Sequence, residues 1–251
     1  YIDFWRQIVT FDYGRSFKTR RPVIEELAKK IQPSLLLTLP ALVITTALSL
    51  TIALVASFVR GSWLDRGLIF FSVLGMSISF LVYIVLLQYL LAYRLGWFPL
   101  SFHELRGAMT LAKGFEFYTL PVMISVVVAM GYDVRFFRSV LVEETSRDYV
   151  TTAMAKGLSH ARILFVHILR NALIPVITHI MISLPFLITG SLLLERFFTI
   201  PGMGDAMIVA LTNGDYPTIK AITVLVSILF IVSNVFTDIL YAWADPRVKL
   251  R

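Results

Sequence analysis

Long apolar stretches constrain the fold of this chain more than any other feature of its sequence. Five of them reach the length of about 20 residues that a helix needs to cross a bilayer core of about 30 Å. They lie near residues 35–59, 67–93, 118–137, 172–195 and 219–243. With 57% hydrophobic and 16% charged residues, the chain carries more apolar surface than one soluble core could bury. The sequence therefore predicts an all-α membrane protein, a polytopic helical bundle with five spans.

Prolines inside the predicted spans indicate how these helices are arranged. They lie at Pro40, Pro121, Pro175 and Pro185. Each proline removes one backbone hydrogen bond, so a neighbouring helix or a hydroxyl side chain must satisfy the freed carbonyl. The positions indicate kinked helices packed against one another, because a lone anchor helix would not need them.

Charges and turn residues set the expected limits and orientation of the spans. Pro33 is interpreted as lying before the first span, and only a short turn separates that span from the second. Basic residues in the short loops favour a cytoplasmic C-terminus, and an odd number of spans then places Tyr1 outside the cell. We therefore expect residues 1–34 to form an extracytoplasmic segment and residues 35–251 to form the membrane domain. A sixth span is expected upstream of Tyr1, where no initiator methionine stands.

The polar loop at residues 138–171, between the third and fourth spans, carries the strongest functional signal. Gly157 is expected to end a short helix in it, and Ser159 to cap the next one. The apolar residues of the short helix recur at helical spacing and form one stripe: Tyr149, Val150, Ala153, Met154 and Leu158. The pattern predicts a cytoplasmic amphipathic helix, a sharp turn and a second helix that leads into the fourth span.

Two interpretations of the short helix follow from its pattern. An amphipathic helix can lie on the lipid surface. Alternatively, the small side chains of Thr152, Ala153 and Ala155, with no bulky Phe, Trp or Leu beside them, suit close docking into a groove of another protein.

The loop contains Asp148-Tyr-Val-Thr-Thr-Ala-Met-Ala-Lys-Gly157, followed by Ile163-Leu-Phe-Val-His-Ile-Leu-Arg-Asn-Ala172 and Pro175. This pattern is similar to the cytoplasmic signature loop of ABC-importer permeases, in the dipeptide, oligopeptide and nickel branch. Further stretches resemble the same branch: Asp12-Tyr-Gly-Arg-Ser-Phe17, Glu195 with Phe198-Thr-Ile-Pro-Gly-Met-Gly204, Asp215-Tyr-Pro217 and Tyr241-Ala-Trp-Ala-Asp-Pro-Arg247. The chain departs from the general pattern at Thr151-Thr152-Ala153, where Glu-Ala-Ala is usual, and at Arg170, where many permeases have Pro.

The resemblance implies a type I ABC-importer permease, a channel-forming subunit of the bacterial inner membrane that moves peptides. Nickel or another small solute is the alternative cargo. The implied partners are a second homologous permease subunit, two ATPase subunits, an extracytoplasmic substrate-binding protein and membrane lipid. ATP and magnesium would belong to the ATPases, and this chain would hold no cofactor, metal or catalytic residue. The ATPase-coupling residues that the match implies are Asp148, Tyr149, Val150, Thr152, Ala153, Ala155, Lys156, Gly157 and Leu158.

Polar and ionisable side chains inside the spans are the candidates for the translocation path. They are His179 in the fourth span, and Asn234 and Asp238, one helical turn apart on the fifth. We expect Asn234 and Asp238 to point into the bundle. For His179, a hydrogen bond to a neighbouring helix is the favoured alternative to a place on the path. Asp133 and Arg135, at the edge of the third span, are interpreted as neutralising each other.

Other classes of function lack their residues in this sequence. No Gly-x-x-x-x-Gly-Lys-Ser/Thr loop occurs among the 13 glycines, so the chain is not expected to hydrolyse ATP. Cysteine is absent, which removes thiolate chemistry and Cys-based zinc sites. Neither Ser77 nor His103 lies in the motif of an intramembrane protease. No internal repeat suggests a self-sufficient secondary transporter, and no basic run with interleaved aromatics suggests nucleic-acid binding.

Overall fold

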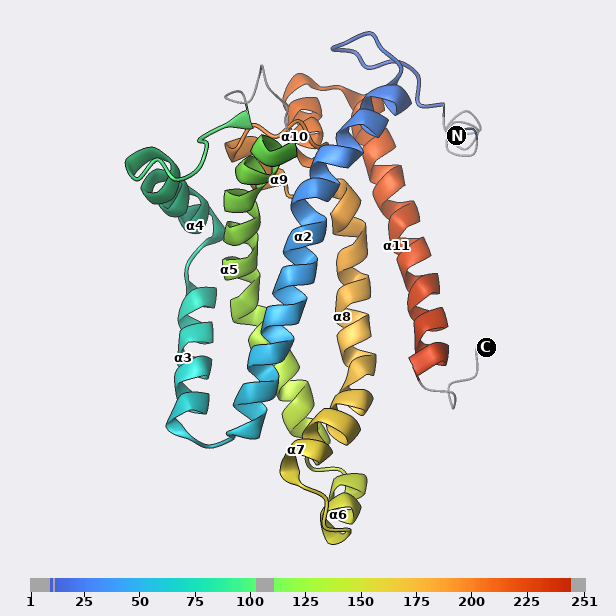
Figure 1. Cartoon of the computed structure of the whole chain (residues 1–251). Coiled ribbons are helices and arrows are strands. Elements are labelled where there is room, and N and C mark those ends of the chain that lie inside the picture. Colours follow the sequence, from blue (N-terminus) through green and yellow to red (C-terminus); the bar gives the residue numbers. More distant parts are fainter. Residues whose placement is uncertain (1–9, 11, 103–110, 245–251) are drawn as a thin grey trace. The chain divides into compact units, whose positions relative to one another are not determined.

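The computed structural model describes residue 10 and residues 12–102 and 111–244, without the side chains of 111–113 and 242–244. Residues 1–9 of the predicted outer segment and residues 245–247 of the closing motif lie outside this part. The described chain is mainly helical (Figure 1), with one isolated bridge between Arg15 and Pro22. The helices are α2 Val23–Phe58, α3 Trp63–Ser77, α4 Phe80–Leu87, η1 Gln88–Arg94, α5 Leu111–Glu144, α6 Asp148–Ala155, α7 His160–Arg162, η3 Ile163–Ile168, α8 Leu169–Thr189, α9 Leu192–Phe197, α10 Met203–Asn213 and α11 Tyr216–Ala244.

The predicted membrane architecture is confirmed. Among the described residues, four helices are long and apolar enough to cross a membrane, and a fifth span results if the bent pair of α3 with α4 and η1 is counted as one. Large apolar side chains on these helices stay uncovered, with Val43 58%, Phe71 70% and Ile231 64% exposed. Such exposure is costly in water but not against hydrocarbon, as expected for lipid-facing spans.

Helix α2 begins at Val23, well before the predicted first span. Pro33, interpreted as the residue before the span, lies inside this helix, so that interpretation is wrong. The helix extends past its apolar part because Val23 and Leu27 are buried against residues of α10 and α11. Tertiary packing of this kind outweighs the single backbone hydrogen bond that a proline removes.

The predicted second span, residues 67–93, is not one straight helix. Helix α3 ends at Ser77, and the helical run that starts at Phe80 is bent from it by 90°. Ile78 between them has extended backbone angles, φ −89° and ψ 130°. Ser77 and Ser79 flank this β-branched residue, and all three have lower helix propensity than Ala, Leu or Met, so local propensity opposes the break only weakly.

The described chain divides into two compact units, and the long helices contribute residues to both. Unit 1 comprises the described residues within 1–40, 84–123 and 183–234, and unit 2 comprises those within 41–83, 124–182 and 235–251. The core of unit 1 consists of Tyr13, Val23, Leu27, Met203, Ala206, Ala221 and Ile222. The core of unit 2 consists of Ala53, Leu54, Phe137, Leu141, Val150, Ala153, Ile163, Leu164, Ile168, Ala172 and Val176.

In unit 1, the fully buried Glu195 organises the segment that follows α8. Its Oε1 accepts a hydrogen bond from Ser34 Oγ of α2 at 2.7 Å, and its Oε2 accepts one from the backbone N–H of Asp205 at 3.0 Å. Ser34 Oγ also accepts a hydrogen bond from the N–H of Met203 at 2.8 Å. The carboxylate therefore caps the first turn of α10, where unpaired N–H groups favour negative charge.

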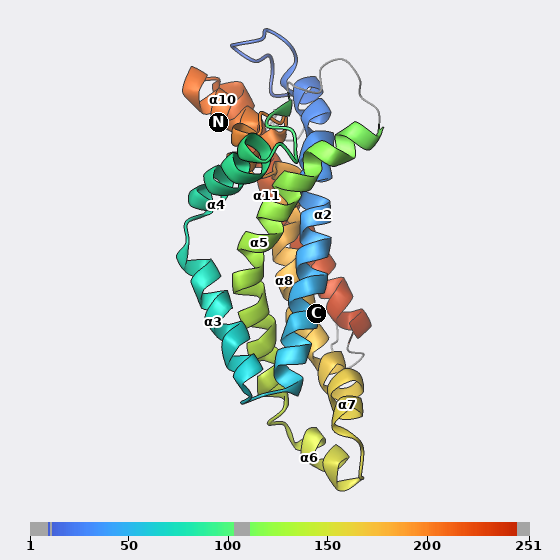
Figure 2. The same cartoon turned by 60° about the vertical axis from the view of Figure 1, so that its left-hand side comes forward.

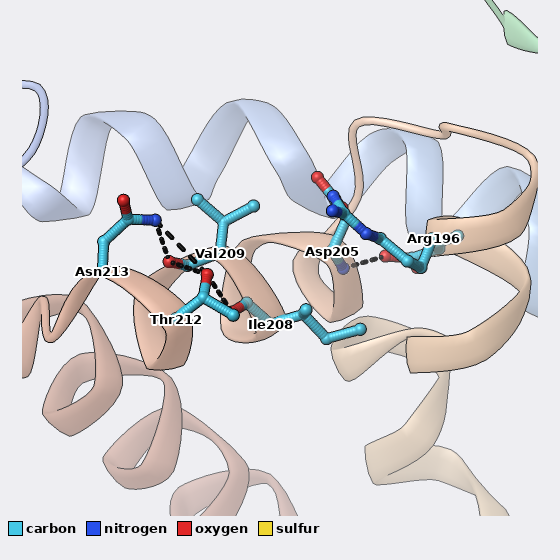
Figure 3. A network of polar contacts seen from close by, with 7 residues as sticks. Arg196, Asp205, Ile208, Val209, Thr212 and Asn213 are labelled. Atoms are coloured by element: carbon cyan, nitrogen blue, oxygen red, sulfur yellow. Dashed lines mark hydrogen bonds and ion pairs between the residues drawn. The ribbon is translucent and has the colours of Figure 1, made fainter.

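Gly190 and Gly202 make room for this carboxylate. A Cβ atom on Gly190 or Gly202 would overlap the Glu195 side chain, and Gly190 also has a φ of +73°. On the surface of the same segment, Arg196 Nη1 lies 3.2 Å from Asp205 Oδ1 and joins α9 to α10 (Figure 3). The motif around Pro201 is thus a packed corner of two short helices.

Asp215 joins two sequence stretches that lie far apart in the chain. Its Oδ2 accepts hydrogen bonds from Ser16 Oγ at 2.5 Å and Thr218 Oγ1 at 2.9 Å, and its Oδ1 accepts one from the N–H of Phe17 at 3.0 Å. Burial alone would raise the pKa of the Asp215 carboxyl, but these hydrogen bonds outweigh it and hold the pKa below its usual value. The segment at residues 15–22, closed by the bridge between Arg15 and Pro22 and called the N-terminal hairpin below, is thereby fixed to the start of α11.

Candidate functional site

The loop between α5 and α8 folds as its sequence predicts. Helix α5 ends at Glu144, a short turn leads into α6, and α6 ends before Gly157, which has a φ of +75° (Figures 1 and 2). Ser159 Oγ accepts a hydrogen bond from the N–H of Arg162 and caps α7. The roles predicted for Gly157 and Ser159 are both confirmed. The chain then continues without a break through η3 into α8.

The inner face of α6 is buried within unit 2. Val150 is 1% exposed and Ala153 6% exposed, and both belong to the core that includes Phe137 and Leu141 of α5 and Ile168 of η3. Tyr149 and Leu158 pack against the same core and are half-buried. Burying a side chain the size of valine is worth about 1.5–3 kcal/mol, so α6 is held firmly by its own chain.

The outer face of α6 consists of small and polar side chains. Its exposed residues are Asp148, Thr151, Thr152, Met154, Ala155, Lys156 and Gly157. Met154 is 54% exposed, so its predicted place in the apolar stripe is wrong. The predicted coupling set is thus divided: Val150 and Ala153 face the chain's own core, whereas Thr152, Ala155 and Lys156 are open to a partner.

A cluster of charged groups braces the start of α6. Tyr149 Oη donates a hydrogen bond to Glu144 Oε2 at 2.8 Å. Arg147 Nη2 lies 3.4 Å from Glu143 Oε1, and Arg147 Nε lies 3.5 Å from Glu144 Oε1. Burial raises the pKa of the Tyr149 hydroxyl, so this group stays a hydrogen-bond donor at neutral pH. Sequence reasoning overlooked Glu143 and Glu144, although the i,i+4 spacing of Glu143 and Arg147 could have shown one of these pairs.

Arg138, also overlooked, connects α5 to the start of α3. Its Nε and Nη2 each donate to one oxygen of Asp65, both at 2.7 Å. Asp65 is 3% exposed and also accepts a hydrogen bond from the N–H of Gly61. A bidentate arginine–carboxylate pair fixes the relative orientation of the two side chains as well as their distance. No local spacing could have predicted it, because the partners lie 73 residues apart.

The favoured interpretation of His179 is confirmed, because its Nε2 lies 3.0 Å from Asp133 Oδ1 of α5. The imidazole also stacks on Phe136 with ring centroids 4.9 Å apart. The interpretation of Asp133 and Arg135 as a neutralising pair is wrong. Asp133 takes His179 as its partner, while Arg135 Nη1 lies 3.7 Å from Met76 Sδ. Residues 133 and 135 are two apart on a helix and point to different faces.

Asn234 and Asp238 lie on α11 and are exposed on this chain, so the expectation that they point into its bundle is wrong. Neither has a hydrogen-bonding partner within the part of the chain that the structure describes. No set of three or more His, Asp or Glu side chains that could hold a metal ion occurs among the described residues.

Comparison with known proteins identifies the kind of molecule. The family described as "Binding-protein-dependent transport system inner membrane component" matches residues 47–250, which include the whole loop between α5 and α8. This chain belongs to that family. The assignment confirms the resemblance to ABC-importer permeases and places this permease, as a multi-pass protein, in the inner membrane.

Curated relatives of this permease come from several bacteria. It is 33% identical to the glutathione transport system permease protein GsiC of Salmonella paratyphi A over 100% of this chain and 80% of that protein. It is 34% identical to a putative peptide transport system permease protein of Brucella abortus over 95% of this chain and 76% of that protein. The permease is the membrane component of an importer, and its family is not itself catalytic.

Proposed function

We propose that this permease forms, with a second homologous permease, the channel through which an ATP-driven importer moves short peptides. Two ATPase subunits would bind the permease pair, one of them on the exposed face of α6 in this chain, and an extracytoplasmic binding protein would deliver the cargo. The names of the relatives, which refer to glutathione and peptide transport, support peptides as the cargo class. ATP and magnesium would be bound by the ATPases alone.

The observation that carries this proposal is the division of α6 into two faces. Because Val150 and Ala153 are buried in the core of unit 2, α6 exposes no continuous apolar face that could lie on lipid. The exposed face offers Thr152, Ala155 and Lys156, whose small or polar side chains allow close approach of another protein backbone. Only Met154 among the exposed residues of α6 is a large apolar group.

The bracing of the loop supports a mechanical role. A helix seated in a groove can transmit motion only if its own attachments are stiff. The core around Leu141 holds α6 to both neighbouring helices, and the pair of Arg138 with Asp65 holds α5 to α3. A shift of α6 driven by ATPase closure would therefore tilt the attached helices of unit 2.

The polar residues in the spans divide into those that join two helices, which we call bracing, and those that are candidates for the translocation path. We assign His179 to bracing, since it bonds to Asp133 within unit 2. Asn234 and Asp238 stay path candidates. An exposed carboxylate on a span is costly against lipid, so this face of α11 is expected to meet water or the second permease.

Site-specific crosslinking combined with transport tests the proposal. The chain has no cysteine, so single cysteines can be placed without background. In membranes that contain the whole complex, Thr152→Cys and Ala155→Cys should crosslink to the ATPase, and the buried Ala153→Cys should not. In proteoliposomes, uptake of a radiolabelled tripeptide should require ATP and the binding protein. Nickel ions serve as the control cargo. Crosslinking to lipid alone would refute the docking role, and nickel uptake without peptide uptake would refute the cargo.

A further inference from the structure

Unit 1 contains a cleft that the transport role described above does not use. Its volume is about 560 Å³, within the range of about 300–1,000 Å³ typical of small-ligand sites. The N-terminal hairpin, the first turns of α2, and α10 with the start of α11 form its walls. Apolar side chains that line it include Val23, Leu27, Ala206, Val209 and Ala210.

Four cationic side chains surround this apolar lining. Lys18 and Arg21 come from the hairpin, and Lys29 and Lys30 come from α2. None of the four has a hydrogen-bonding or ion-pair partner among the described residues. Positive charges that converge on one concave site without internal partners attract a negatively charged ligand.

The acidic residues of the cleft are already engaged. Glu26 accepts a hydrogen bond from Thr19 Oγ1 at 2.9 Å. Asp205 pairs with Arg196, as Figure 3 shows. Asp215 accepts its hydrogen bonds from the hairpin and Thr218. Neutral donors leave the carboxylates of Glu26 and Asp215 charged, and Arg196 neutralises Asp205. The lining therefore carries four cations against two uncompensated anions, and its net charge is positive.

The hairpin that carries Lys18 and Arg21 is preorganised. Ser16 Oγ accepts hydrogen bonds from the N–H groups of Lys18 and Thr19, both at 3.2 Å, while it donates to Asp215. The N–H of Ser16 also donates to the carbonyl of Arg21 at 3.0 Å. A backbone fixed in this way lowers the conformational cost of binding, because only the cationic side chains remain to be ordered.

We propose that this cleft binds a short peptide of the cargo through its carboxylates, with an apolar side chain of the peptide on the lining. The inference rests on the proposed function and adds a cargo site on this subunit. Ammonium and guanidinium groups form charge-assisted hydrogen bonds with carboxylates. The small-ligand volume favours cargo over a surface of the binding protein, because a stable protein interface covers about 800 Å² on each partner.

Equilibrium dialysis tests this site without the binding protein. The complete permease–ATPase complex in nanodiscs is mixed with radiolabelled Leu-Val-Glu or with its neutral analogue, N-acetyl-Leu-Val-Gln amide. The lining variant combines Lys18→Gln and Arg21→Gln. Its matched control combines Arg15→Gln and Arg20→Gln, which remove equal charge from the same hairpin at residues outside the cleft lining.

The lining variant should bind Leu-Val-Glu about two- to thirtyfold more weakly, the loss expected for two partly exposed ion pairs. The control variant should bind it like the wild type, and the neutral analogue should not distinguish the proteins. A second lining variant, Lys29→Gln with Lys30→Gln on α2, repeats the test if the hairpin variant does not fold.

Three results would overturn the proposal. Equal losses in the lining and control variants would show an effect of net charge alone. Unchanged binding in both lining variants would show that the cleft does not hold the peptide. Weaker docking of the peptide-free binding protein, with unchanged peptide binding, would assign the cleft to that protein. ATP-dependent uptake of the neutral analogue by the wild type is measured separately, so a failure of the importer function is distinguished from a failure of the cleft.

Discussion

Ala153 and Ala155 lie two residues apart on α6 but on different faces. Ala153 is 6% exposed within the core of unit 2, whereas Ala155 is exposed. Replacing each by leucine adds the same volume to the two faces of one helix. The pair of variants therefore separates the folding of the loop from its docking.

The two substitutions should differ in free energy. Ala153→Leu forces three extra carbon atoms into a packed core, which costs about 1–3 kcal/mol of loop stability. Ala155→Leu lies on the surface and should change that stability by no more than about 0.5 kcal/mol. In a close-fitting groove of the ATPase, however, the same leucine would cost about 1–3 kcal/mol, or roughly 5- to 150-fold in affinity.

Two assays resolve these effects. Limited trypsin digestion of the permease without the ATPase, which cuts after Arg147 and Lys156, reports opening of the loop and should be faster for Ala153→Leu only. ATPase pull-down and ATP-dependent peptide uptake report docking and should fall for Ala155→Leu while its digestion stays like the wild type. Full uptake by Ala155→Leu, with a normal ratio of ATP hydrolysed to peptide moved, would refute the docking of this face.

Contacts elsewhere in the chain give three more expectations. Tyr149→Phe should lower loop stability by about 1 kcal/mol and speed trypsin digestion below pH 10. Because burial raises the pKa of Tyr149, the stability that its hydroxyl contributes is lost only as the pH rises through the raised pKa. Asp215→Asn should lower the melting temperature at pH 7. Since the pKa of Asp215 is held below 3.8, the difference in melting temperature from the wild type should vanish as the pH falls through that lowered pKa. A difference that persists at lower pH would contradict this role of the carboxylate. Gly190→Ala would overlap Glu195 and should abolish the monodisperse peak in size-exclusion chromatography, whereas Gly67→Ala, with open space around it, should preserve that peak.

The spans could be predicted from the sequence because apolar length is a local property. All five predicted stretches overlap apolar helices of the structure. The sharp bend before Phe80 could not be read in the same way, since Ile78 and its serine neighbours are only slightly less helical than the residues around them. The early start of α2 depends on packing against α10 and α11, which no local pattern contains.

In the loop, too, features that depend on a single residue were predictable, whereas features that depend on packing against distant residues were not. Gly157 and Ser159 were predictable because a left-handed turn and a helix cap each depend on one residue. The face of α6 that a residue occupies was not fully predictable. Met154 is as apolar as its neighbours, yet the core around Phe137 and Leu141 admits Val150 and Ala153 and leaves Met154 outside. Which residues of α6 are buried therefore depends on the shape of the helices that pack against it, and not on periodicity alone.

The attachments between α5 and α8 show how a shift of α6 could reach the spans. The two helices share the core near Leu141 and the contact of Asp133 with His179. Asp133 and Leu141 are separated on α5 by about 12 Å at 1.5 Å per residue. Attachment at one level fixes the distance between two helices, whereas attachment at two levels also fixes their angle. Within unit 2, α5 and α8 should therefore tilt together as one body. Spin labels on these helices should report the same distance with and without ATP, and a change in that distance would show that the two helices move separately.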